Sequence, residues 1–460
     1  MRHSRVAALV AAVFLSAGVV SSPVSAAKKP VYEIDEARNA VVIEAVEGAT
    51  GQPVLSGEID GAAWLGQVPD NWNGDLIVWA HGYRGEGLQL YVDPPPEVAW
   101  LVSQGYAWAA SSYRRNSYDP GIGVIDTKNL TDYFKDMLGD DLDTTYLAGA
   151  SMGGHVTAAA IEQFPSFWDG AMPICGVVGD VELFDYFTDY SVGAAAIAGL
   201  GTDYPIRSPE FLTETAPEIK QALSTDPAGA WAGGLPQAFG APSPLTPAGQ
   251  RFKDFVEIGS GGDRVTYDTA WLYWHGLASA TGDFFFELAA SDGTVASRSG
   301  TVGQNVDTVY ADEYGPSYAD LDASVLRLSA ANRVRKSQGM QPTVLINGTP
   351  SVPVLSMHTT GDLFVPIEME QIYAQEVQAN GLGDLLVQRA IRDVGHCSFT
   401  GPEIQQGFSD LFAWVEDGVK PAGEDLVNDI SSPTLGCDFT VTTNPLSDGS
   451  RLRFLLEPCS

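Results

Sequence analysis

The chain has 460 residues and a strongly acidic composition, with 58 Asp and Glu against 25 Lys and Arg and a formal net charge of -33. A surface of this sign repels nucleic acids and anionic membranes, so we expect neither as a partner. The length exceeds what a minimal catalytic core needs and predicts a core with an insertion, whereas nothing in the composition indicates an oligomeric state.

Residues 1–26 have the pattern of a secretory signal peptide. Arg2 and Arg5 precede an apolar stretch over 6–20, and small residues lead to Ala26, after which we expect cleavage. The apolar stretch is shorter than the roughly 20 residues that a membrane span needs. We therefore expect a secreted protein, extracellular or periplasmic, with no membrane insertion.

The apolar run 76–80 predicts a buried strand that leads into the sequence His81-Gly82-Tyr83. Glycine lets the backbone of this loop come close to a neighbouring turn. The N–H of Tyr83 is therefore a candidate hydrogen-bond donor to an oxyanion that develops during acyl transfer. We interpret His81 as a structural residue of the loop.

The most informative segment is 149–153, Gly-Ala-Ser-Met-Gly. A β-branched, apolar run over 144–148 predicts a strand before it, and the Ala-rich run 154–161 predicts a helix after it. A serine at such a turn is held in a strained conformation with its hydroxyl exposed. We predict Ser151 as a nucleophile and the N–H of Met152 as an oxyanion donor. Because ordinary strand-helix turns can carry the same pattern, this interpretation requires a base and an acid further along the chain.

A long segment, 181–349, contains several helical patterns separated by Pro and Gly clusters. We expect it to form a helical lid over the site. Most of its aromatic side chains are expected to pack inside the lid, and the remainder to line a pocket for a bulky apolar group. The helices are predicted over residues 181–200, 209–223, 247–258, 269–288 and 321–337.

A serine hydroxyl needs a base that takes its proton and a carboxylate that orients the base. The run 352–358 predicts a late strand that is followed by Asp362, and the helical pattern 367–377 follows. The run 385–391 then predicts the last core strand, and its loop carries His396. We predict Asp362 as the orienting acid and His396 as the base.

Other acids and histidines offer alternatives. Asp180 follows the strand that ends at Cys175 and is the alternative acid. His358 lies within the strand before Asp362, and we interpret it as a structural hydrogen-bonding residue. His155 belongs to the helix after Ser151, where packing is expected, and His275 lies among aromatic residues of the insertion.

The order of these signals, a His-Gly loop, the serine turn, a Gly-Asp and a Gly-His, resembles the α/β-hydrolase family. The resemblance covers about residues 40–180 and 350–418 and implies a mostly parallel sheet flanked by helices. It assigns Ser151, His396 and Asp362 to a catalytic triad, with Met152 and Tyr83 as oxyanion donors. The predicted units are a signal peptide, a core in two parts, a lid and a C-terminal hairpin, over residues 1–26, 31–180 with 350–420, 181–349 and 431–460.

Within that family, the pair His396-Cys397 resembles tannases and fungal-type feruloyl esterases. Those families also place a cysteine immediately before the nucleophile and link the two cysteines. Here Ala150 occupies that position. The substrate class therefore does not carry over from this resemblance.

The four cysteines allow three pairings, and an exported chain gives them an oxidising environment. Cys437 and Cys459 flank two strand-like runs, so we expect a disulfide that closes a C-terminal β-hairpin. Cys175 and Cys397 remain. In the hydrolase topology both lie beside the nucleophile, so a bridge between them would brace His396. The alternative is two unpaired, buried thiols.

The leading hypothesis is a secreted serine esterase that cleaves a small-molecule or polymer-derived carboxylic ester with a bulky apolar or aromatic part. The reaction would pass through an acyl-enzyme and would need no cofactor and no metal. The second hypothesis is a peptidase on the same fold, with lid carboxylates such as Glu182 and Glu210 as anchors for a terminal amine. The third is a non-catalytic binding protein on the same scaffold.

Overall fold

A computed structural model describes residues 30–459 except 229–230, 277–283, 291–300 and 336–342. The predicted signal peptide lies outside the described residues. In the described part of the chain, no helix has both the length and the apolar character that crossing a membrane requires. The residues from Tyr32 onward form one compact unit, which contains both the sheet and the insertion.

The unit is built on an eight-stranded sheet with the strand order β10-β9-β8-β7-β4-β6-β3-β2. Among the described strands of this sheet, β3 pairs antiparallel with both of its neighbours, β2 and β6, and all the other pairings are parallel. This order, with a serine turn after β7, is that of the α/β-hydrolase fold, which confirms the expectation from the sequence. The strands are β2 (Leu55–Ile59), β3 (Ala62–Gln67), β4 (Asp75–Ala80), β6 (Ala107–Ser111), β7 (Thr144–Ala150), β8 (Gly170–Ile174), β9 (Val354–Thr359) and β10 (Leu386–Ile391). A separate parallel pair joins β1 (Glu33–Ile34) to β5 (Gln89–Leu90).

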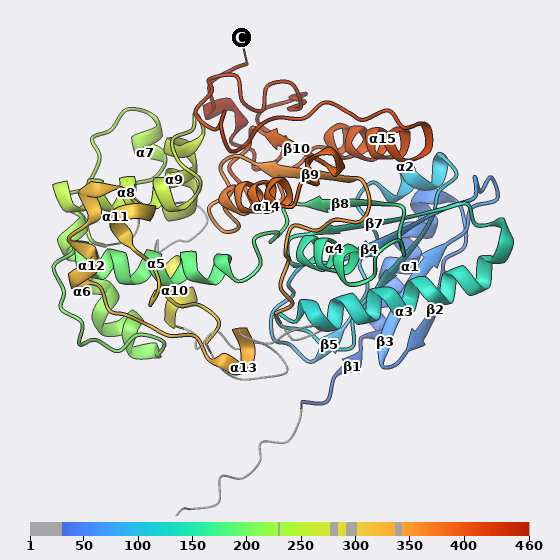
Figure 1. The fold of residues 1–460 in the computed structure, drawn as a ribbon, viewed down its shortest axis with the longest axis horizontal. Helices are drawn as coiled ribbons and strands as arrows, with labels where there is room; N and C mark the ends of the chain where they lie inside the picture. Colours follow the sequence, from blue (N-terminus) through green and yellow to red (C-terminus); the bar gives the residue numbers. More distant parts are fainter. Residues whose placement is uncertain (1–29, 229–230, 277–283, 291–300, 336–342, 460) are drawn as a thin grey trace, which may run out of the picture. The chain divides into compact units, whose positions relative to one another are not determined.

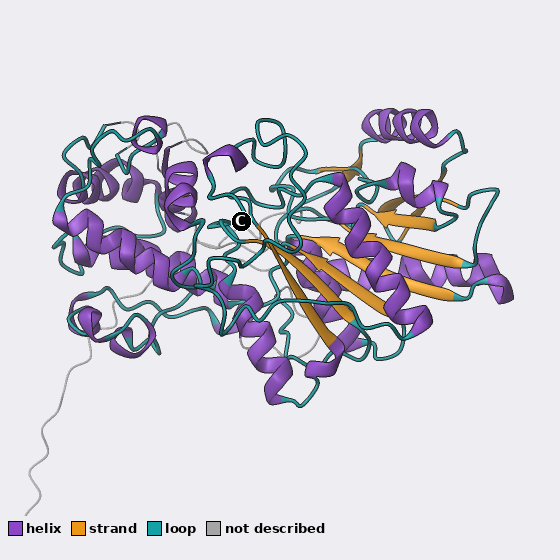
Figure 2. Cartoon of the chain, turned by 90° about the horizontal axis from the view of Figure 1, so that it is seen from above, coloured by secondary structure: helices purple, strands orange, loops and turns teal. Residues whose placement is uncertain are grey.

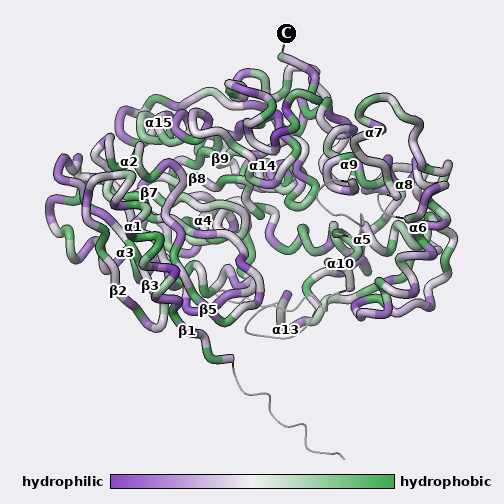
Figure 3. Tube along the Cα trace, turned by 180° about the vertical axis from the view of Figure 1, so that it is seen from behind, coloured by the Kyte–Doolittle hydropathy of each residue, from purple (hydrophilic) through white to green (hydrophobic). Residues whose placement is uncertain are grey.

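Helices cover both faces of the sheet (Figures 1 and 2). In β4, Leu76 and Val78 pack into one hydrophobic cluster with α3, α4 and α14, while Ile77 and Trp79 pack into another with α1, α2 and α15. Every residue of β4 is buried, as expected for a parallel strand covered on both sides. Figure 3 shows hydrophobic stretches of the trace in the region of β3 and β7. The helices are α1 (Glu36–Thr50), α2 (Val98–Ser103), α3 (Pro120–Leu138), α4 (Met152–Gln163), α14 (Glu368–Ala379) and α15 (Gly401–Asp417).

The segment between β8 and β9 is mainly helical, and it packs in the same hydrophobic cluster as α3, α4 and α14. The helices predicted over 181–200 and 247–258 correspond to α5 (Glu182–Ile197) and α8 (Pro247–Gly259). The helix predicted over 209–223 begins as a π-helix, Phe211–Thr215, and continues as α6 (Ala216–Leu223). The remaining helices are α7 (Leu235–Ala238), α9 (Tyr267–Gly276), α10 (Phe284–Ala290), α11 (Tyr310–Glu313), α12 (Leu321–Ser324) and α13 (Asn332–Arg335).

The prediction of one helix over 321–337 is wrong, because α12 and α13 are separate short helices. Between them the backbone of Leu328 exchanges hydrogen bonds with Asn305, whose backbone N–H donates to the Leu328 carbonyl over 3.0 Å. The Asn305 side chain accepts from the Leu328 N–H over 2.6 Å. These bonds to a distant segment replace the intrahelical bonds that the sequence pattern favoured.

The prediction of a C-terminal β-hairpin is also wrong, because residues 431–459 contain turns and one short 3₁₀-helix, Arg453–Leu455, but no strand. The buried Arg453 guanidinium donates to Asp393 and to Glu403, each over 2.7 Å. The Asp448 carboxylate accepts the N–H groups of Thr443 and Asn444. Such side-chain bonds to the backbone compete with a strand ladder. The C-terminal segment thus packs against the loop after β10 instead of forming a sheet of its own.

Candidate active site

The turn between β7 and α4 holds Ser151 in a strained backbone conformation, with φ 59° and ψ -122°. A Cβ atom at Gly153 would lie 2.0 Å from the Ala80 carbonyl oxygen, and one at Gly149 would lie 2.3 Å from the Gly153 carbonyl oxygen. Both positions therefore require glycine. The Ser151 N–H donates to the Ile174 carbonyl over 3.0 Å, which ties the turn to β8. Such strain persists only where the surrounding structure fixes it, which is typical of functional sites.

The three residues predicted as a triad meet at the carboxyl ends of their strands. His396 Nε2 lies 2.9 Å from Ser151 Oγ, and His396 Nδ1 lies 2.5 Å from Asp362 Oδ2. Asp362 is fully buried, and its Oδ1 accepts the N–H groups of Phe364 and Val365. The carboxylate is thereby held with its second oxygen on the imidazole. This is the geometry in which a base removes a serine proton while an acid fixes its tautomer.

The alternative acid and base lie in other surroundings. The Asp180 carboxylate accepts the N–H groups of Val181 and Ile346, and burial raises its pKa to about 7. His358 is buried, with Nε2 2.7 Å from the Val365 carbonyl and Nδ1 3.3 Å from Glu370. Neither contacts Ser151 through a hydrogen bond among the described residues. Both therefore have structural contacts that explain their burial.

His155 and His275 are also buried and hydrogen-bonded. His155 Nδ1 lies 2.8 Å from the Tyr118 hydroxyl, and its Nε2 lies 2.6 Å from the Val344 carbonyl of the insertion. Burial lowers the pKa of His155 to about 4, so its imidazole is neutral. His275 Nε2 lies 2.8 Å from the Tyr190 hydroxyl, and burial lowers its pKa to about 3.

The loop after β4 approaches the serine turn closely. A Cβ at Gly82 would lie 3.1 Å from both the Ala150 carbonyl oxygen and Ser151 Cβ, so glycine permits this approach. Tyr83 follows it in the chain. Met152 is the first residue of α4, where backbone N–H groups have no partner within the helix. The predicted donors therefore come from the two segments of backbone that flank the serine.

His81 holds the same loop in place. Its ring stacks on Tyr113 with 3.9 Å between ring centres, and its nitrogens lie 2.7 Å from the Gly82 carbonyl and 3.0 Å from the Ser112 carbonyl. Burial, together with the charge of Arg84, keeps the pKa of His81 well below its usual range. The ring is therefore neutral and donates to one carbonyl at a time, which fits the structural role expected from the sequence.

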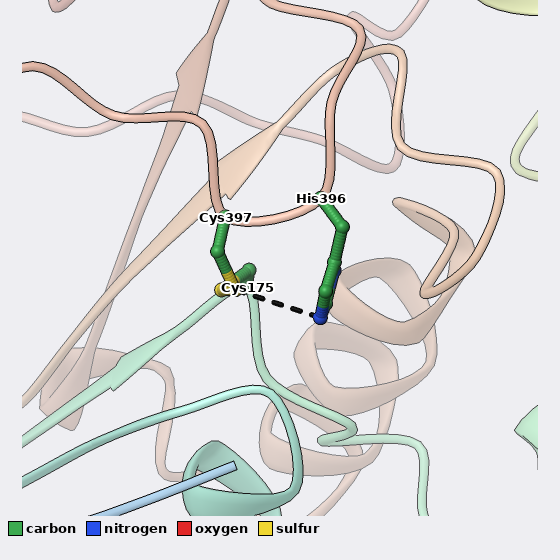
Figure 4. Close-up of side chains that lie close together, drawn as sticks. All are labelled: Cys175, His396 and Cys397. Atoms are coloured by element: carbon green, nitrogen blue, oxygen red, sulfur yellow. Dashed lines mark hydrogen bonds between the residues drawn. A yellow bond between two sulfur atoms is a disulfide. The ribbon is translucent and has the colours of Figure 1, made fainter. Parts of the chain in front are cut away.

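Both expected cysteine pairs are disulfides, with Cα–Cα separations of 5.3 Å for Cys175–Cys397 and 5.4 Å for Cys437–Cys459. The first lies beside the base, with Cys397 Sγ 3.5 Å from His396 Nε2 (Figure 4). The ligand atoms of Cys175, His396 and Cys397 lie within 4.8 Å of one another, which is the spacing of a metal site. Because the two sulfurs are bonded to each other, they are not thiolates that could bind an ion.

A cavity of about 170 Å³ opens beside Ser151. Its walls are mostly apolar, and many come from the insertion. Its charged residues are Glu86, which is exposed, and Arg207, whose guanidinium donates to the Gly303 carbonyl over 2.9 Å. None of the lid carboxylates Glu182, Glu210, Glu214 and Glu218 lines this cavity among the described residues. The apolar and aromatic lining residues are Tyr83, Tyr118, Val177, Leu183, Phe184, Phe187, Ile206, Leu288, Leu328, Phe364 and Val365.

Sequence reasoning missed a tryptophan that connects the insertion to the site. Trp274 Nε1, in α9, donates to the Gly361 carbonyl over 3.0 Å and to the Val394 carbonyl over 2.9 Å. Gly361 precedes Asp362, and Val394 lies two residues before His396. One indole therefore bridges the loops of the acid and of the base. The sequence gives no signal for this contact, because Trp274 lies in an aromatic run that also fits a lid core.

No family model matches the chain. It is 24% identical to the o-phthalyl amidase of Xanthobacter agilis over an alignment of 413 residues that covers 79% of this chain and 87% of that protein. Feruloyl esterase B from Aspergillus oryzae is 15% identical, with a TM-score of 0.44 over 80% of this chain and 82% of that one. Tannin acyl hydrolase from Aspergillus niger is 14% identical, with a TM-score of 0.40 over 80% and 78%. These TM-scores are too low to carry an argument, so the fold assignment rests on strand order and the serine turn.

Proposed function

We propose that this protein is a secreted serine hydrolase that cleaves carboxylic esters with a bulky apolar or aromatic acyl group. The observation that carries the proposal is the hydrogen-bonded series Ser151, His396 and Asp362, with 2.9 Å and 2.5 Å between the paired atoms. A scaffold without catalytic activity has no physical reason to keep a strained serine, a base and a buried carboxylate in this arrangement.

In the proposed reaction, Ser151 Oγ attacks the carbonyl carbon while His396 Nε2 takes its proton. Asp362 holds the imidazole in the required tautomer and stabilises the imidazolium that forms. The N–H groups of Met152 and Tyr83 donate to the developing oxyanion, and removing one such donor typically costs about 10²–10³ in kcat. His396 then protonates the leaving group, and water releases the acid through the same residues.

The acyl group is assigned to the cavity beside Ser151. Its aromatic walls, which include Phe184, Phe187 and Phe364, favour a planar apolar group. Its volume of about 170 Å³ is enough for one aromatic ring, since an apolar cavity of about 150 Å³ holds benzene. The name of the Xanthobacter relative, an o-phthalyl amidase, is in keeping with an aromatic acyl group.

Amide cleavage is the second candidate, and the same relative favours it because its name is that of an amidase. The same three residues cleave amides when the leaving amine is positioned to receive a proton. The sequence suggested lid carboxylates as anchors for the terminal amine of a peptide, but none of them lines the cavity among the described residues. The amide substrate that we consider is therefore one held by its acyl group and not a peptide held by its terminal amine. Turnover of an ester and an amide that share one aromatic acyl group would separate the two candidates.

Secretion is supported by the two disulfides and by the basic and apolar residues at the N-terminus. N-terminal sequencing of protein recovered outside the cell would test it. We expect the mature chain to begin after Ala26, and recovery of an uncleaved chain from the cytoplasm would contradict this.

The test of the catalytic proposal is the Ser151→Ala variant. We expect kcat for a p-nitrophenyl ester to fall by about 10⁴–10⁶, with an unchanged circular dichroism spectrum. Stoichiometric labelling by a fluorophosphonate should be lost in the same variant. Retained turnover or retained labelling would refute the role of Ser151.

A further inference from the structure

A second cavity, of about 360 Å³, lies next to the serine turn and shares no lining residue with the first. Its walls include Trp79, Ile174 and Ile404, which pack on the face of the sheet covered by α1, α2 and α15. No residue of the insertion lines it in the described part of the chain. The two cavities therefore have separate walls, the first from both the lid and the core and the second from described residues of the core.

The second cavity adjoins both reacting side chains. Ala150, which lines it, directly precedes the nucleophile, and a Cβ added at Gly82, which also lines it, would lie 3.1 Å from Ser151 Cβ. Cys397 lines it as well, and its Sγ lies 3.5 Å from His396 Nε2 (Figure 4). Ser151 lines the first cavity, whereas the second cavity neighbours Ser151 and His396 only through Ala150, Gly82 and Cys397 among the described residues.

The position of the base determines which half of the substrate binds in each cavity. In acyl transfer, the atom that departs must receive its proton from the base, so the leaving group begins next to Nε2. The disulfide sulfur that contacts Nε2 is a wall of the second cavity. The acyl group then extends to the other side of the carbonyl carbon, where Phe184, Phe187 and Phe364 line the first cavity.

The chemistry of the walls restricts the ligand. Apolar side chains, among them Trp79, Pro94 and Phe399, suit a ring or a branched hydrocarbon. The charged residues that line the cavity are the carboxylates Asp93 and Glu97, and no Lys or Arg lines it among the described residues. Asp93 pairs with Arg84, and Glu97 accepts a hydrogen bond from Gln405 over 2.6 Å. A neutral or cationic group fits these walls, whereas an anionic group would be repelled.

We propose that this cavity binds the alcohol or amine half of the substrate, so that the enzyme acts on esters or amides that are bulky on both sides of the carbonyl. The inference rests on the proposed function of Ser151. In the step concerned, the bond from Ser151 Oγ to the carbonyl carbon forms and the bond from that carbon to the leaving oxygen or nitrogen breaks. The Ser151 proton passes through His396 Nε2 to the departing atom, which enters the cavity as a neutral alcohol or amine.

The first experiment fills the cavity with the Ala150→Leu variant. The readout is the ratio of kcat/KM for 2-naphthyl acetate to kcat/KM for methyl acetate, two esters with the same small acyl group. We expect the ratio to fall by about tenfold or more, because added methyl groups exclude a ring from an apolar pocket. An unchanged ratio would overturn the proposal. The matched control is Leu446→Ala, at a side chain that is 65% exposed and lines neither cavity, and there the ratio should stay constant.

A second measurement uses the unaltered protein, so that a folding defect of Ala150→Leu cannot obscure the result. Benzoate and 2-naphthol, added together as inhibitors, should bind at the same time because they occupy different cavities. Mutual exclusion in a double-inhibition plot would contradict the assignment.

A third comparison tests the sign of the charge. We expect 2-naphthyl acetate to be cleaved faster than the acetate ester of 6-hydroxy-2-naphthoate, whose leaving group is anionic. An equal or higher rate for the anionic leaving group would overturn this part of the proposal.

The two proposals fail in different ways. If Ser151→Ala keeps its activity or its fluorophosphonate label, the hydrolase proposal fails. If labelling depends on Ser151 but the two inhibitors exclude each other, only the leaving-group assignment fails.

Discussion

The core and the insertion contribute to the candidate site in different ways. The core supplies every group proposed to act on the reacting atoms, from the ends of β4, β7, β9 and β10. The insertion supplies apolar walls and a few hydrogen bonds to core loops, such as the bond from Trp274 to the Gly361 carbonyl. We infer that changes at the reacting groups of the core affect kcat, whereas changes in the insertion affect which acyl group is accepted.

Among the tests of this division of roles, the largest effect is expected from Asp362→Asn. The Asn oxygen can still accept from Phe364 and Val365, so the fold should persist, but the amide NH₂ would then face His396 Nδ1. This favours the wrong imidazole tautomer and should lower kcat by about 10⁴. The matched control is Asp180→Asn, because Asp180 was the alternative acid, and its kcat should stay within the same order of magnitude. A large loss of kcat in Asp180→Asn with little loss in Asp362→Asn would instead identify Asp180 as the orienting acid.

The next effect concerns the disulfide beside the base. Replacing Cys175 and Cys397 together with serine should free the His396 loop and lower kcat by about 10²-fold, since small misplacements of reacting groups have effects of this size. KM should change less. The control is the double serine variant of Cys437 and Cys459, which should lower the melting temperature with little loss of kcat. Equal losses of kcat in both variants would show that neither bridge acts on the base.

A smaller effect is expected from the insertion. Phe187→Ala removes a ring that stacks on Phe364 with 5.9 Å between centres and lines the acyl cavity. We expect KM for an aromatic acyl ester to rise by about tenfold, with kcat nearly unchanged. Phe239→Ala, at a side chain in the insertion that is 71% exposed, is the control and should leave both constants as they are. A large loss of kcat in Phe187→Ala would contradict the division of roles.

The smallest effect concerns pH and the contact between the two regions. Burial, with the nearby Glu182 and Glu313 of the insertion, raises the pKa of Glu368 from 4.5 to about 8, against the opposing charge of Arg264. The folded chain then binds this proton more tightly than the unfolded chain. The free energy of unfolding should therefore fall as pH rises from about 5 to 8. Glu368→Gln should flatten this decline by on the order of 1 kcal/mol, measured by denaturant unfolding at both pH values. An unchanged slope would contradict the assignment.

The core could be predicted from the sequence because its signals are local. The strand before Ser151, the glycines on either side of it and the Gly-Asp and Gly-His loops each depend on neighbouring residues. The insertion was predicted less well, since Leu328 pairs with Asn305 instead of continuing a helix. The hairpin prediction for the C-terminal segment was wrong for the same reason. The ion pairs of Arg453 with Asp393 and Glu403 join residues that lie far apart in sequence.

In the candidate site, too, features with a local sequence signal were predicted and features that depend on tertiary packing were not. Ser151, His396 and Asp362 were identified from their local context, and the structure brings them together. The bridge made by Trp274 and the cavity beside Ala150 were not predictable, because each depends on how separate segments pack. Tertiary contacts of this kind leave no periodic pattern in a single sequence.

The Cys175–Cys397 disulfide also makes the proposed activity depend on the compartment in which the chain is oxidised. Cellular interiors keep most thiols reduced, so a newly made chain there would hold its imidazole in a loop without this covalent anchor. Under the secretion proposed above, oxidation after export would complete the site outside the cytoplasm. The proposed hydrolase would then have low activity toward the esters of the cell that makes it. Its full activity would develop only outside that cell.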